Sequence, residues 1–196
     1  MKNGRLERWP FFFVRRLECL ITAKGMTLVW DYPHPYTMAL TPQPADIDGL
    51  NHTNNAVYVQ WCEKIGWAHS QALGLGLADY QRLDRAMAIH RAEYDYLLPT
   101  LLDEELTLAT WLLDSDGKLG MRRGFQLVRA RDGVTVLRGR WQLVCIEIGS
   151  GRARRMPDEF RAVYLPALAL TAAASAPAAA SSAATAVSAA ADAPSP

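Results

Sequence analysis

The stretch from residue 46 to residue 72 reads DIDGLNHTNNAVYVQWCEKIGWAHSQA, a polar segment followed by a regular apolar pattern. From Val57 onward, apolar residues recur at spacings of 4, 4, 3 and 4, which is typical of one face of an α-helix. Asn54 or Asn55 can cap the start of this helix, and Gly74 sits just past its end. We therefore predict a long helix whose apolar stripe consists of Val57, Trp61, Ile65, Ala68 and Ala72.

The segments on either side of this helix have the patterns of strands. Residues 36–40 alternate as a strand does, and four extended runs follow the helix without a second long helical pattern. Turn signals of the Asp-Gly type at residues 115–117 and 131–133 separate the last three runs, and a short closing helix is expected to begin at Pro157. The runs cover residues 85–97, 104–113, 119–131 and 134–148.

The order of strand, long helix and four antiparallel strands predicts an α+β fold. A helix with a single apolar stripe is expected to lie against one face of a curled antiparallel sheet. The other face of that sheet also needs cover, and one short closing helix does not supply it. We therefore expect the chain to form a homodimer.

Composition divides the 196 residues into three regions. Residues 1–25 hold six Lys or Arg against two Glu and are expected to be a poorly ordered extension. Residues 26–166 have the patterned sequence of one globular domain. Residues 167–196 are rich in Ala, Ser and Pro, which cannot bury enough apolar surface to offset the entropy of ordering, so we predict a disordered tail.

Charge and cysteine content exclude several classes of function. The net charge is +1 and the basic surplus lies in the N-terminal extension, so no clustered cationic face for nucleic acid is expected. Cys19, Cys62 and Cys145 are scattered, which argues against disulfides and a thiolate zinc site and favours a cytoplasmic location. No apolar run approaches the ~18 residues of a membrane span. No metal site is expected, because no histidines have partners at ligand spacing.

The polar segment at residues 46–55 carries the chemistry that we expect of this protein. It holds two carboxylates, Asp46 and Asp48, at the start of the long helix. Backbone N–H groups and the helix dipole favour negative charge at such a position. A carboxylate that activates water or attacks directly, beside amides that polarise a carbonyl oxygen, is the minimum apparatus for hydrolysing an acyl bond.

At this point the sequence resembles a known family. The pattern is similar to the signature of hotdog-fold acyl thioesterases of the 4-hydroxybenzoyl-CoA thioesterase type, and Arg91-Ala92-Glu93-Tyr94 resembles the strand after the family's helix. The resemblance implies the hotdog fold, in which a curled antiparallel sheet wraps a long central helix. The matching residues are Asp48-x-x-x-His52-x-Asn54-Asn55-x-x-Tyr58-x-x-Trp61-x-Glu63.

The resemblance also implies an activity and an assembly. The expected reaction is hydrolysis of an acyl thioester, usually an acyl-CoA, to a free acid and a thiol, without a metal or an organic cofactor. The expected assembly is a homodimer or a dimer of dimers (a homotetramer), with each active site at a subunit interface. The family commonly has Gly where this chain has Asn51, and plant acyl-carrier-protein thioesterases of the same fold also lack that Gly. The carrier, coenzyme A or acyl carrier protein, therefore stays open.

The resemblance gives each matching residue a role. Asp48, rather than Asp46, is the expected nucleophile or general base, because it has the family's spacing to Tyr58. His52 and the amides after it would frame the thioester carbonyl. Asn51 tolerates left-handed backbone angles, so the turn can survive, and its side chain could itself bind the carbonyl. The remaining roles are helix entry for Asn54 and Asn55, walls of the acyl pocket for Tyr58 and Trp61, and orientation of first-turn groups or a water for Glu63.

Plainer structural interpretations stay open for several of these residues. Asp48 is also suited to a simple turn, Tyr58 and Trp61 to the core, and Glu63 to a solvated helix face. The arginines of residues 122–155 are by default solvated, although those at 152–155 could contact the phosphates of coenzyme A. A hotdog hydratase that adds water to an enoyl thioester, and a non-catalytic acyl-CoA-binding module, remain the alternative functions.

Overall fold

The computed structural model of the protein describes residues 21–23 and 26–173. Most of the predicted N-terminal extension and the tail from residue 174 onward lie outside these residues. The helices and strands are β1 (Ile21–Ala23), β2 (Met26–Leu28), β3 (Tyr36–Leu40), the 3-10 helix η1 (Pro44–Asp46), α1 (Asn55–Ala72), α2 (Leu77–Leu83), β4 (Arg85–Tyr96), β5 (Leu106–Ser115), β6 (Gly120–Arg129), β7 (Thr135–Glu147) and α3 (Asp158–Ala173).

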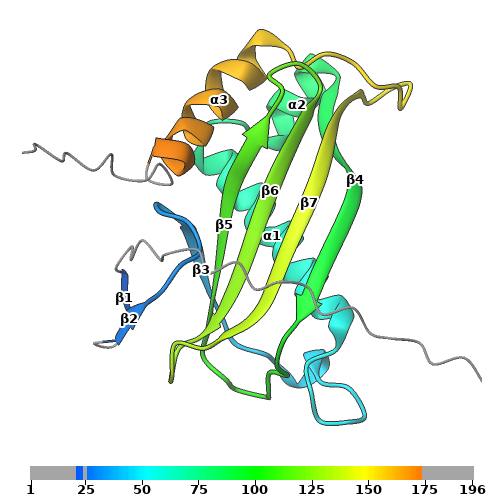
Figure 1. The fold of residues 1–196 in the computed structure, drawn as a ribbon. Coiled ribbons are helices and arrows are strands. Elements are labelled where there is room, and N and C mark those ends of the chain that lie inside the picture. The colour runs from blue at the N-terminus through cyan, green and yellow to red at the C-terminus, as the bar shows by residue number, and fades with distance from the viewer. Residues whose placement is uncertain (1–20, 24–25, 174–196) are drawn as a thin grey trace, which may run out of the picture.

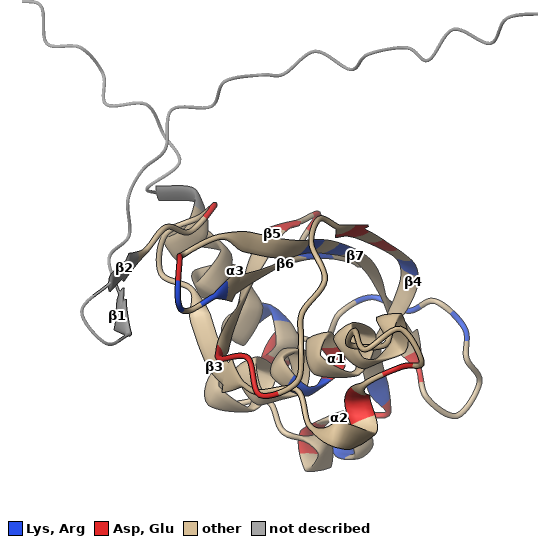
Figure 2. Ribbon diagram, turned by 90° about the horizontal axis from the view of Figure 1, so that it is seen from below, with Lys and Arg blue, Asp and Glu red and all other residues tan. Residues whose placement is uncertain are grey.

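Five of these strands form one antiparallel sheet in the order β3-β5-β6-β7-β4. The sheet curls around α1, which lies on its concave side (Figures 1 and 2). Charged residues of both signs are spread over the surface rather than gathered on one face (Figure 2). The four strands after the helix and the wrapping of α1 are as predicted.

The predicted signals at the ends of the elements are confirmed. The Asn54 side chain accepts a hydrogen bond from the Ala56 N–H at 2.9 Å and caps α1. Gly74 follows the helix with a φ of +102°, in the region that favours glycine. The two hairpin turns place Gly117 and Gly133 at φ angles of +65° and +68°.

The buried face of α1 differs from the predicted stripe by about one position. Trp61 is only half-buried and Ala72 is exposed. Small residues turn the helix toward the sheet: a Cβ added at Gly66 would lie 3.4 Å from Trp141 Cζ3, so the backbone approaches the sheet closely there. The residues that α1 buries are Val57, Tyr58, Cys62, Ile65, Gly66 and Ser70.

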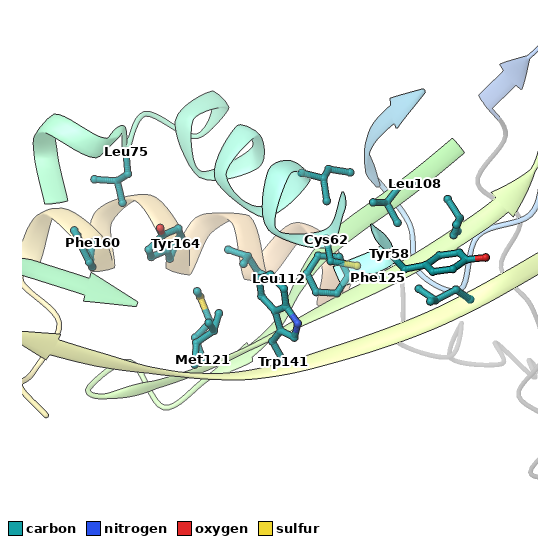
Figure 3. Packing of buried hydrophobic residues seen from close by; sticks show 14 of the residues in the cluster. Tyr58, Cys62, Leu75, Leu108, Leu112, Met121, Phe125, Trp141, Phe160 and Tyr164 are labelled. Atoms are coloured by element: carbon teal, nitrogen blue, oxygen red, sulfur yellow. The ribbon is translucent and has the colours of Figure 1, made fainter. Parts of the chain in front are cut away.

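The main core fills the space between α1 and the concave face of the sheet (Figure 3). Phe125 and Trp141 meet edge to face there, with ring centroids 4.6 Å apart. Tyr58 and Cys62 reach this core from α1, and Phe160 and Tyr164 reach it from α3. One continuous apolar cluster therefore holds α1, α2 and α3 against the strands β5, β6 and β7.

The chain's own N-terminal segment covers part of the convex face of the sheet, which corrects the expectation that a second subunit would supply this cover. Trp30 is 1% exposed and packs edge to face on Trp111, with centroids 6.1 Å apart. The Trp111 indole donates a hydrogen bond to the Pro33 carbonyl at 2.8 Å. This second core contains Leu28, Trp30, Ala109, Trp111 and Val128.

The C-terminal helix is longer than predicted. Instead of a short helix before a tail beginning at residue 167, α3 continues to Ala173. Phe160 and Tyr164 anchor it in the core, and the Ala- and Leu-rich residues that follow have high helix propensity. Four other elements were not predicted: β1, β2, η1 and α2. Of these, β1 lies inside the predicted N-terminal extension and pairs with β2 just after it.

We expect Trp30→Ala to lower the free energy of unfolding by about 3–5 kcal/mol, because removal of the indole leaves a cavity in the core on the convex face. Chemical denaturation of the full chain measures this loss. Trp67→Ala is the matched control: Trp67 is 48% exposed, and its loss should be about 1 kcal/mol. Equal losses for the two variants would contradict a structural role for the segment at residues 28–33.

Candidate active site

Asp48 closes the loop that enters α1. Its Oδ1 atom accepts hydrogen bonds from the backbone N–H groups of Leu50, at 2.8 Å, and His52, at 3.2 Å. The backbone N–H of Asp48 in turn donates to the His52 carbonyl at 2.8 Å. In the described part of the chain, no hydrogen bond reaches the other carboxylate oxygen, Oδ2. The half-buried carboxylate is thus fixed through one oxygen and available through the other.

Asn51 stands at the point where this loop turns. Its φ is +61°, in the left-handed region where Asn is tolerated better than most residues. The turn therefore survives without glycine, as predicted. The Asn51 and His52 side chains are both exposed beside Asp48.

A buried hydroxyl network anchors the loop to the domain. Thr100 Oγ1 lies 2.7 Å from Thr53 Oγ1 and 2.9 Å from the Tyr58 hydroxyl. The Thr100 N–H also donates to the Tyr58 hydroxyl, at 3.1 Å. Tyr58 is therefore a fixed support beneath the loop. Its phenol holds the segment after β4 against the start of α1.

Most of the predicted site residues lie in the loop or in the first two turns of α1, and Glu63 lies apart from them. Asp48, Asn51, His52 and Asn54 share the loop, and Asn55 begins the helix directly after it. Trp61 packs against the Tyr58 ring, with centroids 5.4 Å apart. Glu63 lies nine residues beyond the helix cap, about 13 Å along the axis at 1.5 Å per residue.

Glu63 belongs instead to a cavity of about 90 Å³ between α1 and the concave face of the sheet, which we call the inner cavity. Glu63, Trp67 and Ile89 are exposed and form its mouth beside β4. Its walls include Met87, Met121 and Leu143. Its floor is polar and buried, and is formed by Ser70, Tyr80, Arg123 and Tyr164.

Arg123 is the residue that sequence reasoning missed. It was expected to be solvated, but it is 3% exposed and points to the concave side of β6. Its guanidinium donates hydrogen bonds to His69 Nδ1 at 3.1 Å, Ser70 Oγ at 3.2 Å and Thr110 Oγ1 at 3.4 Å. Burial lowers its pKa. The signal was present in the sequence, because Met121, Arg123, Phe125 and Leu127 alternate along one face of the strand.

His69, which had no expected role, stacks on Tyr36 with ring centroids 4.9 Å apart. Burial and then the Arg123 charge lower the pKa of His69 from 6.5 to about 4. Since arginine only donates, His69 Nδ1 is the acceptor and its proton sits on Nε2. At neutral pH the imidazole is therefore an uncharged partner of the guanidinium.

Two tyrosines complete the floor of the inner cavity. The hydroxyls of Tyr80 and Tyr164 share a short hydrogen bond, and Tyr164 donates to Ser70 Oγ at 3.2 Å. Burial raises the pKa of Tyr80, so this phenol stays protonated. The floor thus presents one cation and several neutral hydroxyls.

A larger hollow, about 600 Å³ in volume, lies on the convex side of the sheet. Its cations are in part neutralised, since Arg122 pairs with Asp114 and Arg91 pairs with Glu93 at 2.6 Å. Over residues 21–23 and 26–173, no group of three or more His, Cys, Asp or Glu side chains is placed to hold a metal ion. No helix within the same residues is long and apolar enough to cross a membrane.

Comparison with known proteins identifies the family. A model of the thioesterase-like superfamily matches residues 42–164, which include the loop, α1 and the four long strands. The chain belongs to this superfamily, and its fold is the hotdog fold. Among curated proteins, none matches the sequence significantly.

Solved structures agree on the fold at low sequence identity. A hypothetical protein from Staphylococcus aureus in complex with CoA superposes with a TM-score of 0.64 at 19% identity, over 69% of this chain and 84% of that one. The 1,4-dihydroxy-2-naphthoyl-CoA thioesterase from Synechocystis superposes with a TM-score of 0.61 at 16% identity, over 67% of this chain and 96% of that one. The 12:0-ACP thioesterase from Umbellularia californica superposes with a TM-score of 0.62 at 17% identity, over 68% of this chain and 50% of that one.

The lowered pKa of His69 predicts a pH dependence of stability. An unfolded histidine binds a proton near pH 6.5 and the folded one only near pH 4, so the free energy of unfolding falls as the pH drops through this window. At pH 4.5 we expect a loss of about 2 kcal/mol from this group. Chemical denaturation at pH 7 and pH 4.5 measures it. The His69→Gln variant should lose less than the unchanged chain, and an equal loss in both would contradict the assignment.

Proposed function

We propose that this protein hydrolyses an acyl thioester, most simply an acyl-CoA, with Asp48 as the nucleophile or general base. The observation that carries the proposal is the state of the Asp48 carboxylate. One oxygen is fixed by two backbone N–H groups, while the other accepts no hydrogen bond within the described residues. Membership in the thioesterase-like superfamily supports the same reaction.

In the proposed reaction, Asp48 Oδ2 takes a proton from a water molecule as the water oxygen attacks the thioester carbonyl carbon. Negative charge then develops on the carbonyl oxygen. His52 and the Asn55 N–H stabilise that charge, aided by the helix dipole. Among residues 53–57, the Asn55 N–H is the one backbone donor without an acceptor in the described structure. The C–S bond breaks, and the sulfur leaves as a thiol after it receives the proton.

The proposed active unit is a homodimer formed through β4. In the described sheet β4 is an edge strand that pairs only with β7, so its other side presents unpaired backbone groups. Large apolar side chains are exposed along and just after this strand, as expected of a surface covered by a second copy. They are Ile89, Tyr96, Leu97 and Leu98.

Antiparallel pairing of two β4 strands would bring different parts of the two chains together. The start of β4, with Met87 and Ile89, lines the inner cavity. The end of β4 lies at the catalytic loop, where the Tyr96 hydroxyl donates to the Asn55 carbonyl at 3.4 Å. In an antiparallel pair the start of one strand lies beside the end of the other. Each inner cavity would then open toward the Asp48 loop of the second copy.

The same arrangement gives a role to the arginines at residues 152–155. Their loop is fixed at the start of β4, where the Gly149 N–H donates to Asp84 Oδ1 at 3.0 Å. Arg154 pairs with Glu147 at 3.5 Å, while Arg152 and Arg155 are exposed. These guanidinium groups are suited to bind the phosphates of coenzyme A. The loop would lie near the Asp48 loop of the second copy.

We expect Asp48→Asn to lower thioester hydrolysis by ~10²-fold or more, because the amide cannot accept the proton. The amide oxygen can still accept the loop's two hydrogen bonds, so the fold and the dimer should survive. Release of free thiol from a panel of acyl-CoAs and acyl-carrier-protein thioesters measures the effect. A loss of activity that only parallels a loss of folded protein would mean that Asp48 is structural.

Asp46→Asn is the matched control for this experiment. Asp46 Oδ2 accepts a hydrogen bond from the Gln43 N–H at 2.8 Å, which is a local role in η1. Its substitution should reduce activity only mildly, and the reverse ranking would identify Asp46 as the base. Tight acyl-CoA binding without release of thiol from any substrate would instead indicate a binding module.

A further inference from the structure

We propose that the inner cavity binds an acyl group that ends in a carboxylate, and that Arg123 is the residue that recognises this carboxylate. The substrate class would then be ω-carboxyacyl thioesters, and the product a dicarboxylic acid. This inference rests on the proposed thioester hydrolysis and specifies its substrate.

The first observation is a buried charge without a counter-ion. Arg123 is 3% exposed, yet none of the described carboxylates forms an ion pair with it. Two other arginines of the sheet are paired with carboxylates: Arg122 with Asp114, and Arg138 with Asp31 at 2.6 Å. An uncompensated buried cation destabilises a fold by several kcal/mol. A ligand carboxylate would supply the missing negative charge.

The second observation is that the guanidinium retains donors for a ligand. The three hydrogen bonds to His69, Ser70 and Thr110 leave two of the five N–H groups of Arg123 without a partner among the described residues. Two donors of one guanidinium are what a carboxylate needs for bidentate binding. Arg123 lines the inner cavity, so the ligand can reach these donors from the mouth.

The third observation is the chemistry of the groups that surround Arg123. His69, Ser70, Tyr80 and Tyr164 are neutral and hydrogen-bond one another or the guanidinium. The one carboxylate that lines the cavity, Glu63, is exposed at the mouth. The floor is therefore positive, and the Ser70 hydroxyl, which accepts hydrogen bonds from Tyr164 and Arg123, keeps its own proton to donate to an anion.

The walls and the position of the cavity suit the rest of such an acyl group. Met121 and Trp141 flank the space between α1 and the sheet (Figure 3), and Met87 and Leu143 also line it. These apolar side chains would hold a methylene spacer. The mouth opens beside β4, where antiparallel pairing would place the Asp48 loop of a second copy. The thioester would then lie at that loop and the distal carboxylate at Arg123.

The test compares ω-carboxyacyl-CoAs with straight-chain acyl-CoAs of the same carbon number, from four to ten carbons. We expect the unchanged protein to favour the ω-carboxyacyl member of its best pair by ~10-fold or more in kcat/KM. Arg123→Met keeps an unbranched side chain but removes the charge. It should lower kcat/KM for that substrate by ~100-fold and abolish the preference over the straight-chain partner.

Arg122→Met is the matched control. Arg122 is the next residue on β6, but it is exposed on the convex side and pairs with Asp114. This variant should retain the preference of the unchanged protein. If Arg123→Met fails to fold, inhibition of the unchanged protein by the free acids replaces it: a dicarboxylate should inhibit at least ~10-fold more tightly than the monocarboxylate of equal length.

The outcomes separate the two proposals. Hydrolysis of straight-chain thioesters with no preference for the carboxylate, or a preference that Arg123→Met does not change, would overturn the role of Arg123 and leave thioester hydrolysis standing. No hydrolysis of any thioester would refute the proposed function itself.

Discussion

One long helix inside a curled sheet is the constraint on which the rest of this structure depends. Because α1 fills the concave side, the chain can build its core from one cluster of residues between helix and sheet. The N-terminal segment with Trp30 covers part of the convex side. The single chain also leaves open the outer edge of β4, and both the Asp48 loop and the mouth of the inner cavity border that edge.

The two ends of α1 have different chemistry. At its start, the Asp48 carboxylate sits in a short loop supported by a buried network of Thr53, Tyr58 and Thr100. Toward its other end, His69 and Ser70 meet the Arg123 guanidinium over an internal cavity. The first arrangement suits the cleavage of an acyl bond and the second suits the recognition of a negative group. Because the length of α1 separates them, we propose that a second copy brings them to one substrate.

The features of the structure that depend on local sequence pattern were predicted correctly. The helix cap at Asn54, the left-handed turn at Asn51 and the two glycine hairpins follow from residue type and spacing, and all are present. The buried face of α1 was predicted about one position off, because small residues rather than large ones set the approach at Gly66. Hydrophobic periodicity gives little weight to glycine and serine.

The parts that were missed depend on contacts distant in sequence. Trp30 packs on Trp111 across eighty residues, so no local pattern could show that the convex face is covered. The continuation of α3 into the Ala-rich region depends on Phe160 and Tyr164 being anchored against α1 and α2. Arg123 was missed for a different reason. The alternation along β6 places it on the apolar side of the strand, but its charge led us to expect a solvent-exposed side chain.

The assembly of one site from two chains can be tested by pairing defective subunits. Asp48→Asn and Arg123→Met chains are co-expressed with different affinity tags, and the heterodimer is purified and assayed on an ω-carboxyacyl-CoA. One of its two sites then holds both unchanged residues, so we expect about half the activity of the unchanged dimer. The heterodimer of an unchanged chain with the double variant should be nearly inactive. The reverse result, an inactive first heterodimer and a half-active second one, would show that Asp48 and Arg123 serve the same site within one chain.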